Sequence, residues 1–315
     1  MSAPMDLRIF VEPQQGTTYA RLRTLAVEAE RLGFDGFFTS DHYQHMGDGD
    51  GGPGPLDALT TLAGLACDTE RLRLGTLVTP ITFRGPGPLA VAIAQIDEMS
   101  GGRVELGLGA GWYEEEHRSY AIPFPTLGGR FERLEEQLAI LTGLWTTPPG
   151  ATFDYAGVHY RVEASPALAK PVQSPHPPIV MGGYGQRRTP RLAAAYAAEF
   201  NVPFCPVAAF SGVCDNVREA CRSRDRDPAT MAFSVAQVVC CGADEHELAR
   251  RATAIGREVG ELRENGVAGT PAECAATVAA FRAAGADRLY LQVLDDTDLD
   301  HLRLIAEAVA PAAAG

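Results

Sequence analysis

Long apolar runs are absent from this sequence of 315 residues. No window approaches the roughly 18 uninterrupted apolar residues that a membrane-spanning helix needs. The first residues, MSAPMDLRIF, also lack the basic segment followed by an apolar stretch that marks an export signal. These absences predict a cytoplasmic protein that is neither exported nor membrane-spanning.

The sequence has no CxxC pair, and its seven cysteines are an odd number. Cys240 and Cys241 are adjacent in the chain and cannot form an ordinary disulfide with each other. This usage predicts structural thiols in a reducing cytosol, without a disulfide framework or a metal site.

Basic residues are scarce, since 27 Lys and Arg stand against 40 Asp and Glu, which gives a formal net charge of −13. Such a balance argues against broad binding to nucleic acid or to an anionic membrane surface. A local basic pocket remains compatible with it.

Short apolar segments alternate with longer amphipathic ones along the whole chain. The predicted strands are Leu7–Val11, Phe34–Thr39, Leu72–Val78, Val104–Leu108, Ile179–Met181, Phe200–Pro203, Phe233–Val239 and Arg288–Val293. The predicted helices follow them over 19–32, 56–67, 89–99, 131–145, 187–198, 208–224, 244–262 with 271–284, and 299–309.

Eight strands that each lead into a helix indicate an α/β fold with a parallel sheet, and eight such units close into a (β/α)8 barrel, the TIM barrel. We therefore expect one domain over residues 1–315. The competing fold is an open doubly wound sheet. The glycine run in GLGAGW does not support it, because the third glycine of a GxGxxG motif would fall on Trp112.

Residues 146–178 interrupt the alternation. The segment is rich in Pro, Gly and aromatic residues, and TFDYAGVHYRVEA alternates like a hairpin around Ala156-Gly157. We interpret it as an insertion after the fourth strand and its helix, between the two halves of the barrel.

In a barrel, functional residues lie where the strands end. The second strand runs directly into Asp41 and His42, and a histidine there can exchange a proton near neutral pH beside an orienting carboxylate. The alternative is that Asp41 caps the next turn and His42 packs. After the third strand, Thr79-Pro80 forces the chain to be extended, and Arg84 lies in a loop of glycine and proline.

Glycines at alternate positions of GLGAGW would let a flat ring approach the backbone, although a crowded strand–helix junction would also require them. Glu114, Glu115 and Glu116 follow at a helix start, where acidic residues are favoured by the helix dipole. After the fifth strand, Gly182, Gly183 and Arg187–Thr189 form a plausible anion-binding helix start. The alternative for Arg187 and Arg188 is a solvated helix surface.

Four motifs in this order and spacing resemble the luciferase-like superfamily: FFTSDH, LGTLVTP with Arg84-Gly85, RVELGLGAGWYEEEH, and HPPIVMGGYGQRRTPRLAAAYAAEFN. The resemblance is closest to the coenzyme F420-dependent branch found in actinobacteria, is strong over residues 7–203, and weakens beyond. It implies that His42 is the catalytic acid or stabiliser at the reacting ring. It further implies cofactor binding by Asp41, Thr76, Leu77, Thr79, Ala110, Gly111, Glu115, Gly182, Gly183, Arg187, Arg188 and Thr189. A non-prolyl cis peptide behind the ring is implied at Thr76-Leu77.

The resemblance implies an oxidoreductase that moves hydride between C5 of coenzyme F420 and a small organic substrate. FMN-dependent monooxygenases and non-catalytic flavin-binding barrels share the same features and remain alternatives. The sequence departs from the sugar-phosphate dehydrogenases of the family, because Trp112 replaces their catalytic glutamate and NVPFCPVAAF contains no lysine. Glucose 6-phosphate is therefore not the expected substrate. The resemblance also implies a homodimer.

Overall fold

The computed structural model describes residues 4–47 and 49–314, and the pairing order of its main strands closes on itself. β1 pairs with β12 and β2, and the order continues through β3, β5, β8 and β9 to β10, which also pairs with β12. Where the register is defined, these neighbours run parallel. The predicted (β/α)8 barrel is thereby confirmed.

The strands of the barrel are β1 (Asp6–Val11), β2 (Gly36–Thr39), β3 (Arg73–Thr76), β5 (Val104–Gly109), β8 (Ile179–Gly182), β9 (Glu199–Pro203), β10 (Ala232–Cys241) and β12 (Arg288–Gln292). Two short strands extend it: β4 (Thr79–Pro80) pairs with β5, and β11 (Val267–Gly269) pairs with β10. The helices are α1 (Tyr19–Arg31), α2 (Ala58–Asp68), α3 (Pro86–Met99), α4 (Glu114–Ser119), α5 (Leu127–Thr146), α6 (Arg188–Tyr196), α7 (Val207–Arg222), α8 (Glu245–Ala254), α9 (Val259–Asn265), α10 (Pro271–Ala283), α11 (Leu299–Ala308) and α12 (Pro311–Ala314).

Helix α1 shows how local sequence sets these elements. The Thr18 side chain accepts a hydrogen bond from the Arg21 N–H at its start, which satisfies one of the free donors of the first turn. Leu22, Leu25, Ala26 and Ala29 are buried on one side of the helix. Gly33 follows the helix at φ +89°, a conformation that costs glycine little.

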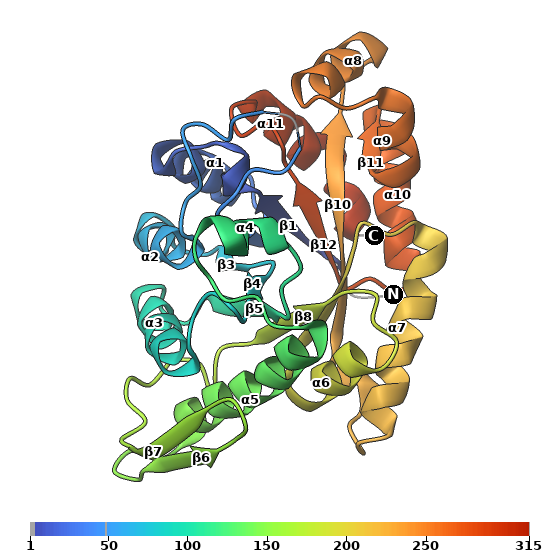
Figure 1. Ribbon diagram of the computed structural model, residues 1–315. Helices are drawn as coiled ribbons and strands as arrows, with labels where there is room; N and C mark the ends of the chain where they lie inside the picture. The colour runs from blue at the N-terminus through green and yellow to red at the C-terminus, as the bar shows by residue number, and fades with distance from the viewer. Residues whose placement is uncertain (1–3, 48, 315) are drawn as a thin grey trace. The chain divides into compact units, whose positions relative to one another are not determined.

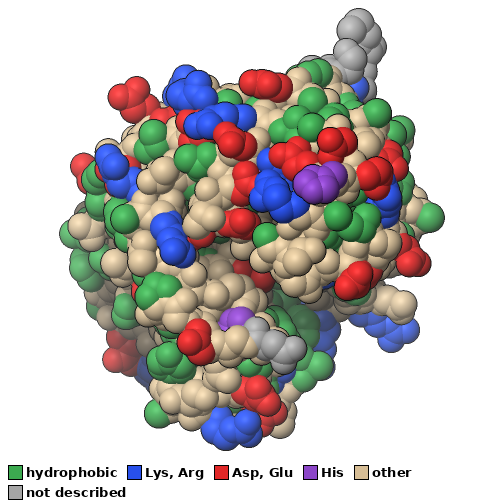
Figure 2. Space-filling view, turned by 90° about the horizontal axis from the view of Figure 1, so that it is seen from above, with side chains coloured by type: hydrophobic (Ala, Val, Ile, Leu, Met, Phe, Trp, Pro, Cys, Tyr) green, Lys and Arg blue, Asp and Glu red, His purple; other side chains and the backbone are tan. Residues whose placement is uncertain are grey.

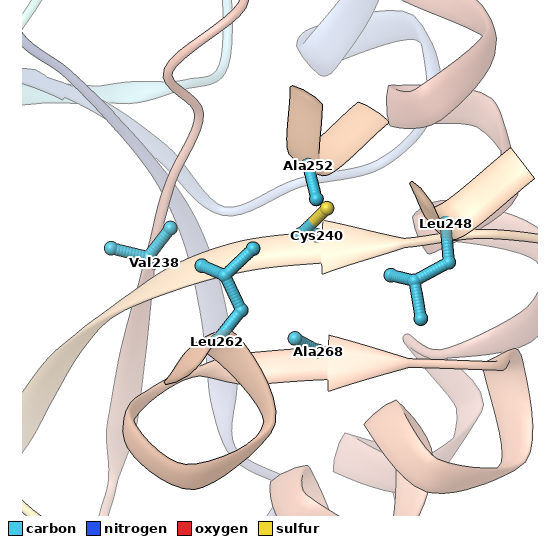
Figure 3. Close-up of a cluster of buried hydrophobic side chains, with 6 residues drawn as sticks. All are labelled: Val238, Cys240, Leu248, Ala252, Leu262 and Ala268. Carbon is cyan, nitrogen blue, oxygen red and sulfur yellow. The ribbon is translucent and has the colours of Figure 1, made fainter. Parts of the chain in front are cut away.

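The chain divides into two compact units. Unit 1 comprises Met1–Glu12, Thr18–Thr39 and Met181–Gly315, and unit 2 comprises Pro13–Thr17 and Ser40–Val180. In unit 1, α9 and α10 pack against β11 (Figure 1). A cluster of buried apolar side chains lies there between β10, β11, α8 and α9, with Val238, Cys240, Leu248, Ala252, Leu262 and Ala268 as its members (Figure 3).

Unit 2 contains the predicted insertion. β6 (Phe153–Ala156) and β7 (Arg161–Ser165) form an antiparallel hairpin beside α5, which confirms the hairpin around Ala156-Gly157 (Figure 1). The buried carboxylate of Glu136 on α5 accepts N–H bonds from Val158 at 2.8 Å and Tyr160 at 2.9 Å in the turn. This carboxylate fixes the hairpin to the helix.

Two predicted elements differ from the structure. The strand predicted over Leu72–Val78 is interrupted after Thr76, and the helix predicted over 244–262 is two helices, because Gly256 at φ +66° ends the first. β11 was not predicted, since three residues give no recognisable alternation. The prediction of one domain over residues 1–315 stays a prediction.

All seven cysteines are free thiols, six of them buried and Cys67 exposed. Among the residues that the structure describes, no helix is long and apolar enough to cross a bilayer. On the face seen in Figure 2, Lys and Arg side chains lie among Asp and Glu side chains rather than in one continuous basic area.

Candidate cofactor and proton-transfer site

His42 lies three residues after the end of β2, and its imidazole is bonded on one side only. The ring nitrogen Nδ1 is 2.9 Å from Oε1 of Glu116. The side chain retains 14% of its exposure, and no described residue forms a hydrogen bond with Nε2. One nitrogen is therefore anchored while the other remains available.

Glu116 is the buried partner of this histidine, at 1% exposure. It lies in α4, whose first turn is Glu114, Glu115 and Glu116. Its second oxygen, Oε2, accepts the backbone N–H of Tyr43 at 2.9 Å. Both carboxylate oxygens of Glu116 thus contact the segment that contains His42 and Tyr43.

Arg84 joins two further carboxylates beside this segment. Its guanidinium donates to the fully buried carboxylate of Asp41 and to Asp57, and it lies 3.2 Å from the hydroxyl of Tyr43. Asp57 is also the N-cap of α2, where it accepts the Thr60 N–H at 2.8 Å. Burial of the guanidinium acts to lower the pKa of Arg84, but Asp41 and Asp57 raise it above its usual range. Arg84 therefore stays charged, and Asp41 has a partner that satisfies it in the interior.

A second histidine, His117, lies in α4, and both of its ring nitrogens have partners. Nδ1 of His117 lies 2.6 Å from the carbonyl oxygen of Tyr113, and Nε2 lies 2.6 Å from the hydroxyl of Thr82. The side chain is fully buried. His117 holds α4 to the loop after β4 and has no group left to offer a substrate.

Aromatic rings surround the imidazole of His42. Trp112 lies edge-on to it with 5.8 Å between ring centroids, and stacks on Tyr113 at 5.3 Å. The indole is 66% exposed, which is unusual for so large an apolar side chain. An exposed flat ring next to a histidine with a free nitrogen is a surface suited to an apolar or planar molecule.

The glycines of β5 have a structural explanation. A Cβ added at Gly107 would lie 1.9 Å from the carbonyl oxygen of Thr76, and one at Gly109 would lie 2.9 Å from the side chain of Val78. The chain between β3 and β4 occupies this space, so close strand packing alone requires these two glycines. Gly111 has a φ of +78° and needs glycine for its own conformation.

The cis peptide predicted at Thr76-Leu77 is wrong by one bond, because the non-prolyl cis peptide is Leu77-Val78. Thr76 is the last residue of β3, and its hydroxyl donates to the carbonyl oxygen of Gly107 at 2.9 Å. The irregular bond comes after this anchored strand end, in the gap before β4. Thr79 donates to the hydroxyl of Thr76 at 3.1 Å, and both threonines are fully buried.

The predicted anion-binding loop belongs to unit 1 and is more exposed. Gly183 has a φ of +127°, and its N–H donates to the carbonyl oxygen of Asn201 at 3.0 Å, so this donor is not available to a ligand. Arg187 and Arg188 are exposed, and α6 starts without a side-chain cap. Thr189 is buried. The roles of these residues, and of Gly182, stay predictions.

Sequence reasoning chose Glu115 among the three glutamates, but Glu116 is the one that meets His42. Glu115 is exposed, and its carboxylate accepts from the hydroxyl of Tyr113 at 3.3 Å. Glu116 and His117 are the buried residues of α4, and nothing in the sequence distinguishes Glu116 from its two neighbouring glutamates. Nor did the sequence indicate Asp57 or Tyr43. The proposed cofactor contacts of Ala110, Gly111 and Leu77, which are all half-buried, stay predictions.

Comparison with known proteins places the chain in a family. The model of the luciferase-like monooxygenases matches residues 5–263, so the chain belongs to the luciferase-like monooxygenase family. This confirms the resemblance carried by the four motifs.

Individual relatives match over shorter segments. An F420-dependent glucose-6-phosphate dehydrogenase of Microbacterium testaceum (strain StLB037) is 38% identical over 177 residues, which cover 56% of this chain and 50% of that protein. An FMNH(2)-dependent dimethylsulfone monooxygenase of Pseudomonas putida is 31% identical over 161 residues, which cover 51% and 42%. The chain thus spans about half the length of the curated relatives it matches.

Among solved structures, an F420-dependent secondary alcohol dehydrogenase in complex with an F420-acetone adduct superimposes with a TM-score of 0.85. The match covers 98% of this chain and 99% of that one at 18% identity. At this identity the likeness shows the fold alone.

Proposed function

We propose that the protein is a coenzyme F420-dependent oxidoreductase that transfers hydride between the deazaflavin and a small organic substrate. The observation that carries the proposal is the His42–Glu116 pair, in which one imidazole nitrogen is anchored by a buried carboxylate and the other remains free. Family membership and the F420-dependent relatives support the choice of cofactor.

Two features of unit 2 support a flat ring with polar edges as the ligand. Gln14 is fully buried, and its amide nitrogen Nε2 has no hydrogen-bond partner among the described residues, while its Oε1 accepts from Ser40 at 2.6 Å. Such a donor suits a carbonyl on the edge of a deazaflavin or flavin ring. The exposed indole of Trp112 offers an apolar face in the same unit.

When bound, F420 would supply or accept hydride at C5. The protein itself would transfer one proton and hold the reacting groups in position. Nε2 of His42 would give a proton to the substrate oxygen during reduction, or take one during oxidation. Arg84 would hold the side chain of Asp41 and the backbone around His42 in place.

The substrate in this proposal is not a sugar phosphate. Trp112 lies beside His42 where the resembling sugar-phosphate dehydrogenases have a glutamate. An exposed indole gives an apolar contact and no charge, so the site favours uncharged, apolar carbonyl compounds or alcohols.

The alternative, an FMN-dependent monooxygenase, is favoured by the relative from Pseudomonas putida. Titration of the purified protein with F420 and with FMN, followed by fluorescence, separates the two. We expect F420 to bind more tightly and to be reduced or oxidised in the presence of simple alcohols or ketones. Submicromolar FMN binding without F420 binding, together with NAD(P)H-fuelled oxygen consumption, would favour the monooxygenase. Binding of either cofactor without any turnover would favour a non-catalytic flavin-binding barrel.

A further inference from the structure

The two acceptor atoms of Glu116 face two different kinds of donor. The N–H of Tyr43 can only donate, and it occupies Oε2 at 2.9 Å. Nδ1 of His42 lies 2.9 Å from Oε1, and an imidazole nitrogen either donates or accepts according to its tautomer. Because a carboxylate oxygen can only accept, Nδ1 must carry a proton for this contact to be a hydrogen bond.

From this geometry we propose that Glu116 is a positioning residue that fixes the tautomer of His42, keeping the proton on Nδ1 so that Nε2 is the atom that gains and loses a proton. The role in turnover rests on the proposed function, but the tautomer itself does not. Glu116 is at 1% exposure, so water does not compete for its oxygens as it would at the surface.

Glutamine at this position distinguishes a positioning role from a packing role. Its side chain has nearly the same shape, but it has one acceptor oxygen and one donor nitrogen. The N–H of Tyr43 requires the oxygen, which turns the amide N–H towards Nδ1 of His42. That contact is a hydrogen bond only if Nδ1 is unprotonated, so the neutral ring must carry its proton on Nε2 instead.

The test is nitrogen-15 NMR of the imidazoles in protein without cofactor, at a pH where His42 is neutral, with the His42 signals assigned by their loss in His42→Gln. We expect a protonated Nδ1 and an unprotonated Nε2 in the native protein, and the reverse in Glu116→Gln. Glu114→Gln removes an exposed charge from the same turn of α4 and should leave the native pattern. A native ring with its proton on Nε2, or an unchanged tautomer in Glu116→Gln, overturns the proposal. The native measurement decides the question even if Glu116→Gln fails to fold.

Turnover provides the second measurement. With F420 and a substrate identified by the titration above, Glu116→Gln should lower kcat by about 10²–10⁴, as loss of the correct histidine tautomer does elsewhere. The affinity for the cofactor should change little, because both oxygens of Glu116 are occupied by His42 and Tyr43. If the tautomer inverts but no F420 activity is found in any variant, the proposed function fails while the role of Glu116 stands. If native activity is found and Glu116→Gln keeps it, the positioning role fails.

Discussion

Each unit contains a cluster of arginine, aspartate and histidine side chains, and the two clusters have different roles. In unit 2, Arg84 holds Asp41, and His42 keeps Nε2 free. In unit 1, Arg251 holds Asp298 at 2.9 Å, and the Nε2 atom of His301 accepts the N–H of Cys241 at 2.9 Å.

The two clusters differ in their exposure to solvent. His301 is 5% exposed, and Arg251 and Asp298 also bond the backbone at Cys241 and at the start of α11. This cluster therefore fastens β10 to α8 and α11. Residue types alone do not define a site, and the exposed ring of Trp112 beside His42 is what distinguishes the unit 2 cluster.

The largest expected effect is the loss of turnover when His42 is replaced. His42→Ala should lower turnover by about 10²–10⁴, because it removes the only proton-transfer group proposed for the reaction. His246→Ala, which removes an exposed histidine from α8, serves as the control in steady-state kinetics. Wild-type turnover in His42→Ala would abolish the distinction drawn between the clusters.

The next effect concerns stability. Arg84→Met should lower the free energy of unfolding by about 3–5 kcal/mol, because it leaves the buried carboxylate of Asp41 without its partner. Arg161→Met breaks an ion pair whose side chains are 74% and 68% exposed, and it should have little effect on the same denaturant curve. Equal, small losses in both variants would mean that Arg84 is no more than a surface charge.

The third effect is the dependence of stability on pH, which we expect from His301 in the unit 1 cluster. Burial, with a contribution from Arg251, lowers the pKa of His301 to about 4. An unfolded histidine titrates near 6.5, so the unfolded chain binds the proton first. The stability that depends on neutral His301 is complete above about pH 6.5 and is lost as the pH falls towards 4, by about 3 kcal/mol in total.

Unfolding curves at several pH values test this expectation. His301→Gln should show a smaller loss of stability between pH 6.5 and pH 4 than the native protein does, because glutamine does not titrate. His246→Gln, at an exposed position, should retain the native slope. A native slope in His301→Gln would assign the acid sensitivity to other groups.

The smallest expected effect concerns the arginines that belong to neither cluster. Replacing both Arg187 and Arg188 with alanine should weaken F420 binding by on the order of tenfold at low salt and reduce its salt dependence, since both side chains are exposed and screened. A variant with Arg222 and Arg224 replaced by alanine loses two exposed charges from the end of α7 and should bind as the native protein does. Unchanged affinity in the Arg187 and Arg188 variant would show these residues to be an ordinary helix surface.

The sequence by itself determined the order and kind of the main elements. Apolar periodicity, the Thr18 cap and the glycine after α1 are local signals, and they act within a few residues of the chain. The position of His42 could also be predicted, because a residue that directly follows a barrel strand lies at the end of the barrel that carries function. Six of the seven cysteines are buried, as expected of structural core thiols, whereas Cys67 is exposed.

Only the tertiary structure decided which partners these residues have. Glu116 lies 74 residues from His42 in sequence, and three adjacent glutamates offer no local reason to prefer it over Glu115. The cis bond at Leu77-Val78 follows a strand end that is anchored to Gly107 on another strand. The two clusters contain the same residue types, but His301 is buried and accepts the N–H of Cys241, whereas His42 lies beside the exposed ring of Trp112. Such contacts depend on strands and helices meeting after the chain has folded, so residue types and spacing cannot specify them.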